Sequence, residues 1–79
     1  MTITEFIMQW ENAEAVRQEA FQKHQEAINS YFRTMPADRT ETAWNNSLAL
    51  GETFAAASEK AAASWDALED AMRRAMAAR

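Results

Sequence analysis

The sequence predicts an all-α protein, an antiparallel hairpin of two long helices. Three observations favour this class. Alanine, the strongest helix former, occurs eighteen times in 79 residues. Glycine and proline occur once each, which leaves too few turn formers for a β protein. On both sides of the single proline, apolar residues recur at steps of three and four, as on one face of a helix.

The first helix is predicted from about residue 3 to residue 34. Thr2-Ile3-Thr4-Glu5 has the form of a capping box, in which Thr2 and Glu5 bond to each other's backbone N–H groups. The apolar stripe that follows contains Ile3, Phe6, Trp10, Ala13, Ala20, Ala27 and Tyr31, with Arg17 and His24 in the remaining steps. A flanking row with a period of seven contains Ile7, Glu14, Phe21, Ile28 and Met35. At 1.5 Å per residue, this helix would be roughly 48 Å long.

Pro36 is expected to end the first helix, because the residue before a proline is pushed out of the α conformation. We expect a turn at residues 35–38. Asp38 is the expected N-cap of the second helix, with Glu41 at its third position. So short a link makes the two helices antiparallel neighbours.

The second helix is predicted from about residue 39 to residue 78. Its seam contains Trp44, Ser47, Gly51, Phe54, Ser58, Ala61, Trp65, Leu68, Met72 and Ala75. A break at Gly51 is possible, since glycine costs roughly 1 kcal/mol in a helix interior relative to alanine. We expect a continuous helix, because the seam passes through Gly51 in phase.

Folding the chain at Pro36 brings residues whose numbers add up to about 73–75 opposite each other. The expected pairs are Trp10 with Ala62 and Trp65, Ala20 with Phe54, and Ala27 with Trp44 and Ser47. Large side chains thus face small ones, and the alanine runs between Phe54 and Trp65 allow another helix to approach closely.

The chain is expected to form a single domain over residues 1–79 that needs a partner to complete its core. Burial in a chain this short is limited, and the absence of cysteine removes disulfides as a source of stability. The apolar stripe is wider than one partner helix can cover. We therefore expect two hairpins to dimerise into a four-helix bundle of the coiled-coil type.

Charge and composition exclude several function classes. A net charge of −4 disfavours binding to nucleic acid, which needs clustered lysine and arginine. No apolar run has the length of a membrane span, so a membrane is an unlikely partner. The first residues have neither the basic segment nor the apolar core of a secretory signal, and we expect a cytoplasmic protein.

We expect neither an enzyme nor a cofactor-binding protein. The chain has no cysteine nucleophile, no glycine-rich phosphate loop and a single histidine. The carboxylates Asp66, Glu69 and Asp70, and the pair Glu11 and Glu14, fit a solvated acidic surface better than a metal site. No small-molecule substrate is expected.

Polar residues on the apolar stripe have two interpretations each. His24 is either a histidine at the core edge or a proton switch at a dimer axis. Arg17 and Glu14 either lean out to water or form ion pairs between chains that fix the register.

The predicted function is a non-enzymatic protein–protein interaction module, a small homodimeric adaptor or accessory subunit that acts by helix packing. Its partners would be a second copy and another protein. The expected contact residues are Phe6, Trp10, Phe54, Ala61, Ala62, Trp65, Leu68 and Met72. Glutamate at Ala61 or Ala62 should break the association. Two alternatives are an acidic inhibitor, for example from a phage, that blocks a basic nucleic-acid-binding cleft, and an amphipathic coat on lipid or polymer granules.

Overall fold

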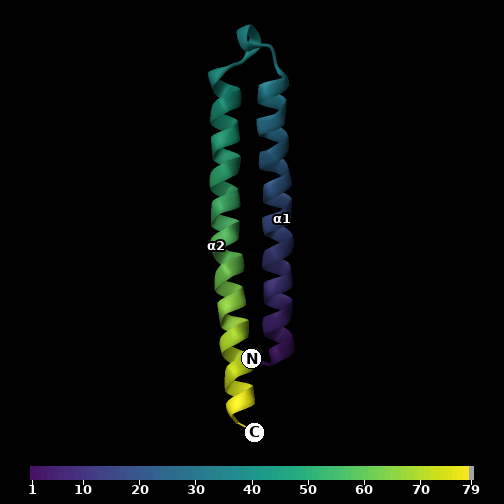
Figure 1. The fold of residues 1–79 in the computed structure, drawn as a ribbon, viewed down its shortest axis with the longest axis vertical. Helices are drawn as coiled ribbons and strands as arrows, with labels where there is room; N and C mark the ends of the chain where they lie inside the picture. Colours follow the sequence, from purple (N-terminus) through teal and green to yellow (C-terminus); the bar gives the residue numbers. More distant parts are fainter. Residues whose placement is uncertain (79) are drawn as a thin grey trace.

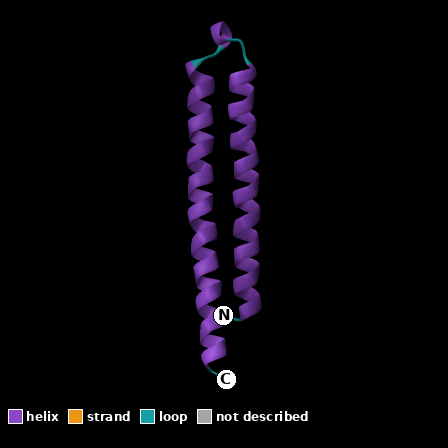
Figure 2. Ribbon diagram, viewed as in Figure 1, coloured by secondary structure: helices purple, strands orange, loops and turns teal. Residues whose placement is uncertain are grey.

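The protein is a hairpin of two long helices that lie side by side and run in opposite directions (Figure 1). The computed structural model describes residues 1–78. Helix α1 spans Ile3–Arg33, a short 3-10 helix η1 spans Pro36–Asp38, and α2 spans Glu41–Ala77. The Cα atoms extend over 65 × 14 × 13 Å. The all-α class and the antiparallel hairpin are confirmed, and residues 1–78 contain no strand (Figure 2).

The start of α1 follows from the predicted cap, with one difference. Thr2 is the N-cap, and its Oγ1 accepts a hydrogen bond from the backbone N–H of Glu5 at 3.2 Å. The Glu5 carboxylate accepts from the Thr2 hydroxyl at 3.3 Å rather than from the Thr2 backbone. The box therefore satisfies one free N–H group of the first turn.

The predicted N-cap of the second helix is wrong, and α2 begins two residues after the predicted start at about residue 39. Asp38 belongs to η1, where its backbone N–H donates to the Met35 carbonyl at 2.8 Å, so it does not act as an N-cap. Thr40 takes that role: its Oγ1 accepts from the Ala43 N–H at 3.0 Å. The link between the helices is therefore longer than the predicted turn at 35–38, because Pro36 starts a separate helical turn of its own.

Arg39 fastens this link to the end of α1. Its side chain donates to the carbonyl oxygens of Thr34, at 3.1 Å, and Phe32, at 3.2 Å. The guanidinium also lies 5.3 Å from the ring centre of Tyr31 and 5.4 Å from that of Phe32. A cation that bonds to the last carbonyls of a helix is favourable for both hydrogen bonding and the helix dipole.

Helix α2 passes through Gly51 without a break, as expected from the phase of its seam. No sequence pattern explains a glycine at this position, but the opposite helix does. A Cβ atom at position 51 would lie 3.0 Å from Nε2 of His24. Gly51 therefore makes room for the His24 ring, which also stacks beside Phe54 at 6.4 Å between ring centres.

Three aromatic pairs between the helices fix the register. The ring centres are 5.2 Å apart for Trp10 and Trp65, 5.4 Å for Phe21 and Phe54, and 5.2 Å for Tyr31 and Trp44. The residue numbers of each pair add up to 75, at the upper limit of the predicted range. The predicted contact of Trp10 with Trp65 is confirmed, whereas the ring that meets Phe54 comes from Phe21 in the flanking row.

The interior of the hairpin is narrow and made mostly of small side chains. Its buried residues are Ala13, Ala20, Ser47, Ala61 and Leu68. No large side chain is completely enclosed within the described chain. The accessible surface is 6026 Å², whereas a compact protein of this mass would expose about 4,800 Å². The hairpin therefore exposes more surface than a compact protein of its mass, and eleven large apolar side chains are among its exposed residues.

A candidate interaction face

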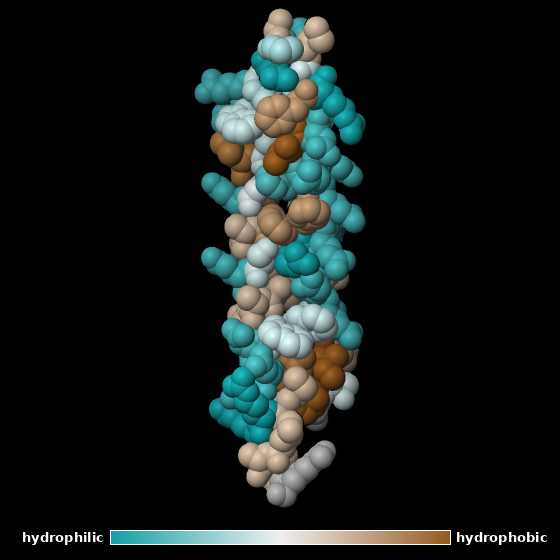
Figure 3. Space-filling model, in the orientation of Figure 1, coloured by the Kyte–Doolittle hydropathy of each residue, from teal (hydrophilic) through white to brown (hydrophobic). Residues whose placement is uncertain are grey.

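The hairpin has two long faces, one on each side of the seam between the helices, and they differ in chemistry. One of them is here called the aromatic face. In each helix it is formed by one row of the seam and by the flanking row next to that row. In α1 it comprises Ile7, Trp10, Glu14, Arg17, Phe21, His24, Ile28 and Tyr31. In α2 it comprises Trp44, Leu48, Ala55, Ser58, Ala62, Trp65, Glu69, Met72 and Met76. Figure 3 shows one side of the hairpin, with apolar side chains along the middle and hydrophilic ones at both edges.

Exposed apolar side chains are concentrated on the aromatic face. Six of the large ones belong to it: Ile7, Phe21, Trp44, Leu48, Trp65 and Met76. On the opposite face, the exposed large apolar side chains among residues 1–78 are Val16 and, beside Gln9, Met1. Single exposed apolar residues are ordinary, but a continuous row of them marks a surface for association.

An open hollow of about 480 Å³ lies in the aromatic face. Trp10 and Trp65 line it together with Ala61 and Ala62. The small alanine side chains leave space beside the two rings on this face, in addition to allowing α1 to approach.

An ion pair lies within the same hollow. Arg17 Nε donates to Glu14 Oε1 at 3.0 Å, and Arg17 Nη2 donates to the same oxygen. The side chains are 26% (Glu14) and 32% (Arg17) exposed. Hydrogen bonds from Arg17 lower the pKa of the Glu14 carboxyl, against a smaller opposing effect of desolvation. The pKa of Arg17 is raised by the same bonds, so both groups are charged at neutral pH.

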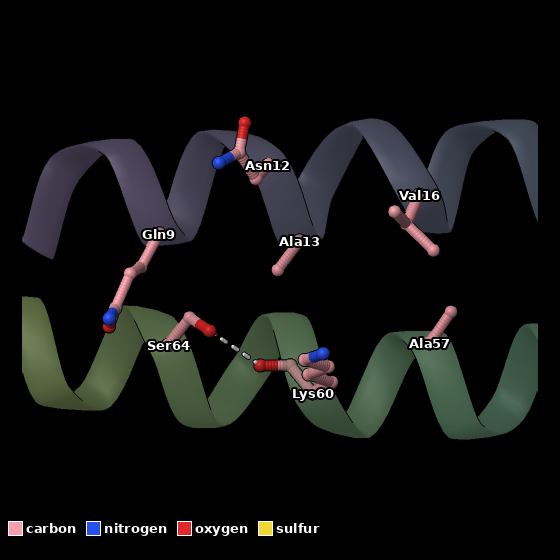
Figure 4. A pocket seen from close by; sticks show the side chains of 7 residues that line it. All are labelled: Gln9, Asn12, Ala13, Val16, Ala57, Lys60 and Ser64. Atoms are coloured by element: carbon pink, nitrogen blue, oxygen red, sulfur yellow. Dashed lines mark hydrogen bonds between the residues drawn. The ribbon is translucent and has the colours of Figure 1, made fainter.

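The opposite face holds a more enclosed and more polar groove of about 420 Å³ (Figure 4). Its lining comprises Gln9, Asn12, Ala13, Val16, Ala57, Lys60 and Ser64. Gln9 reaches from α1 toward α2, Asn12 points away from it, and the Ser64 hydroxyl donates to the Lys60 carbonyl of its own helix at 2.9 Å. These polar groups bond locally or point apart, so they do not converge on a ligand.

The predicted contact residues do not all lie on one surface. Trp10, Ala62, Trp65 and Met72 belong to the aromatic face. Ala61 and Leu68 are buried between the helices. Phe54 contacts Phe21 in the seam, and Phe6 lines a hollow near the N-terminus with Ile3 and Ala71.

Sequence reasoning missed five exposed large apolar members of this face as contact residues, namely Ile7, Phe21, Trp44, Leu48 and Met76. The seven-residue flanking row was the signal that could have identified Ile7 and Phe21. In the second helix, Leu48, Ala55, Ala62 and Met76 lie beside the seam at multiples of seven residues, which could have identified Leu48 and Met76.

The charged residues near the C-terminus form ion pairs along α2. Glu69 pairs with Arg73, and Asp70 pairs with Arg74 at 3.1 Å. Residues 1–78 hold no group of three or more histidine, aspartate or glutamate side chains placed to bind a metal ion. Over the same residues, neither helix has the apolar length that crossing a membrane requires. Comparisons with protein-family models, with curated proteins and with solved structures gave no match.

Proposed function

We propose that the chain is a protein–protein interaction module that associates with a second copy of itself through the aromatic face. The observation that carries the proposal is the concentration of exposed aromatic and aliphatic side chains on one of the two long faces. Two apolar faces pressed together form a four-helix bundle with the enclosed core that one hairpin lacks.

The exposed area supports an interface of ordinary size. The hairpin exposes about 1,200 Å² more than a compact protein of its mass. Stable protein interfaces bury about 1,200–2,000 Å² in total over both partners. A face that runs nearly the length of a 65 Å hairpin can supply such an area.

The biological role that fits best is that of a homodimeric adaptor or accessory subunit. Association through the aromatic face leaves the outer surface of the bundle for a further protein. The function needs no catalytic group, cofactor or small-molecule substrate, and the place of action we propose is the cytoplasm.

The test compares two neighbouring alanines of α2. Ala62 is exposed on the aromatic face, whereas Ala63 is exposed on the outer side of the helix. We expect Ala62→Glu to convert a dimer into a monomer, because a charge would enter the interface, and Ala63→Glu to leave the dimer unchanged. Ala61 is unsuitable for this purpose because it is buried within one hairpin, where glutamate would damage the fold itself.

The measurement is absolute mass by light scattering over a hundredfold range of concentration, with circular dichroism on each sample. A wild-type chain that is helical and monomeric throughout would contradict the proposal. A chain that becomes helical only on adding lipid vesicles would favour a surface coat instead.

A further inference from the structure

We infer that the second copy lies antiparallel to the first, with a twofold axis that crosses the aromatic face between Glu14 and Arg17. The two ion pairs would then meet at the centre of the interface as a cluster of four charges. The inference rests on the proposed self-association and adds its geometry.

Two symmetric arrangements bring the same face of two hairpins together. If the twofold axis runs along the hairpin, α1 of each copy packs on α2 of the other, and both turns lie at one end. If the axis runs across the hairpin, α1 packs on α1, α2 packs on α2, and the turns lie at opposite ends. Both are closed, self-complementary dimers.

The charges distinguish the two arrangements. Residues opposite each other in the hairpin have numbers that add up to 75. With a lengthwise axis, Glu14 and Arg17 would therefore face the levels of Ala61 and Ser58 in the other copy. Both charges would then lose water without gaining a charged partner, which is costly.

With a crosswise axis between the two residues, Glu14 of each copy faces Arg17 of the other. Both hydrogen bonds from Arg17 go to Oε1 of Glu14, so its Oε2 can accept from the second copy. Charge-assisted bonds of this kind offset the loss of water.

The aromatic pairs match in the same arrangement. Trp10 comes four residues before Glu14, and Phe21 comes four residues after Arg17. The axis therefore brings the Trp10–Trp65 pair of one copy onto the Phe21–Phe54 pair of the other, on both sides of the charged centre. Rings packed against rings at a buried centre are favourable beyond their area.

The ends of the face are also complementary. Tyr31 and Trp44, which contact each other near the turn, would fall at the level of Ala75 in the second copy. Met72 and Met76 flank that level on the aromatic face. Methionine sulfur packs favourably against aromatic rings. The proposed axis also lies close to the middle of both helices, so nearly their whole length takes part in the contact.

A charge-exchange experiment tests the central contact. We expect Glu14→Arg and Arg17→Glu each to weaken self-association about tenfold or more, because like charges would meet across the axis. An equimolar mixture should regain the dimer, since two arginines of one chain would face two glutamates of the other. Glu19→Lys and Lys23→Glu are matched controls, as this exposed pair lies off the aromatic face. A mixture of the Glu14 and Arg17 variants that stays monomeric would overturn the inference.

A distance measurement on the otherwise unaltered chain tests the arrangement independently. The chain has no cysteine, so Ala37→Cys in the turn gives one spin label per copy. The crosswise axis predicts labels roughly 60 Å apart, from 1.5 Å per residue along the helices. Labels within about 30 Å would mean that both turns share one end and that the inferred axis is wrong. If the wild-type chain does not associate, the proposed function fails as well; association with short label distances removes only the antiparallel arrangement.

Discussion

At the scale of single residues, the His24 ring of α1 packs against Gly51 of α2, where the missing side chain of the glycine leaves room for it. The imidazole lies where a Cβ at position 51 would make a 3.0 Å contact. Glycine weakens a helix interior, but here that cost is coupled to the placement of a ring on the opposite helix. His24 therefore packs against α2 within the hairpin.

This coupling is measurable in a double-mutant cycle. In the wild-type background, Gly51→Ala should give little or no stabilisation, because the new methyl group displaces the imidazole. In a His24→Ala background the same change should stabilise the hairpin by about 1 kcal/mol, the helix preference of alanine over glycine. Urea unfolding of the wild type and the three variants at one protein concentration gives the free energies of unfolding. Equal gains in both backgrounds would show that His24 and Gly51 are not coupled.

At the scale of elements, the long helices were predictable and their ends were less so. Apolar residues at steps of three and four over about thirty residues predict a helix whatever the helix propensity of single residues, and Pro36 separates the two helical segments. Asp38 and Thr40 are both good N-cap residues, however, and nothing local decides between them. The choice depends on η1 and on Arg39, which bonds to carbonyls five and seven residues earlier. Such contacts exist only once the link has folded.

The role of Arg39 leads to a prediction for the turn. Arg39→Ala removes two hydrogen bonds, to the carbonyls of Phe32 in α1 and of its C-cap Thr34, and two cation–aromatic contacts. We expect a loss of about 1–2 kcal/mol in the free energy of unfolding. Arg33→Ala, an exposed arginine in the last turn of α1, is the matched control and should cost much less. Similar losses in both variants, measured by thermal unfolding, would show that Arg39 does not fasten the link.

At the scale of the whole molecule, the sequence predicted an apolar stripe but not its division into two unlike faces. That division depends on which flanking row of α1 lies beside which row of α2, and hence on the exact register. The prediction therefore mixed residues of the aromatic face, such as Trp65, with residues buried inside the hairpin, such as Leu68. A small error in the register between the helices does not change the predicted fold class, but it changes which residues are predicted to lie together on one surface.

Two exposed methionines, one on the aromatic face and one on the outer surface, allow the roles of the two surfaces to be compared. Met76 is 70% exposed and belongs to the aromatic face, near the end of α2 that extends beyond the start of α1 (Figure 1). Met8 is 56% exposed and lies on the outer side of α1. In the antiparallel dimer Met76 meets Trp44 of the second copy, so glutamate at position 76 would carry a charge into an apolar contact.

We therefore expect Met76→Glu to weaken association measurably and Met8→Glu to leave it unchanged, by sedimentation velocity at matched concentrations. The contrast also bears on the axis. With a lengthwise axis, Met76 would project past the start of the other copy's α1, and its substitution would have little effect. An association that tolerates glutamate at position 76 but not at position 62 would thus support the aromatic face while contradicting the antiparallel arrangement.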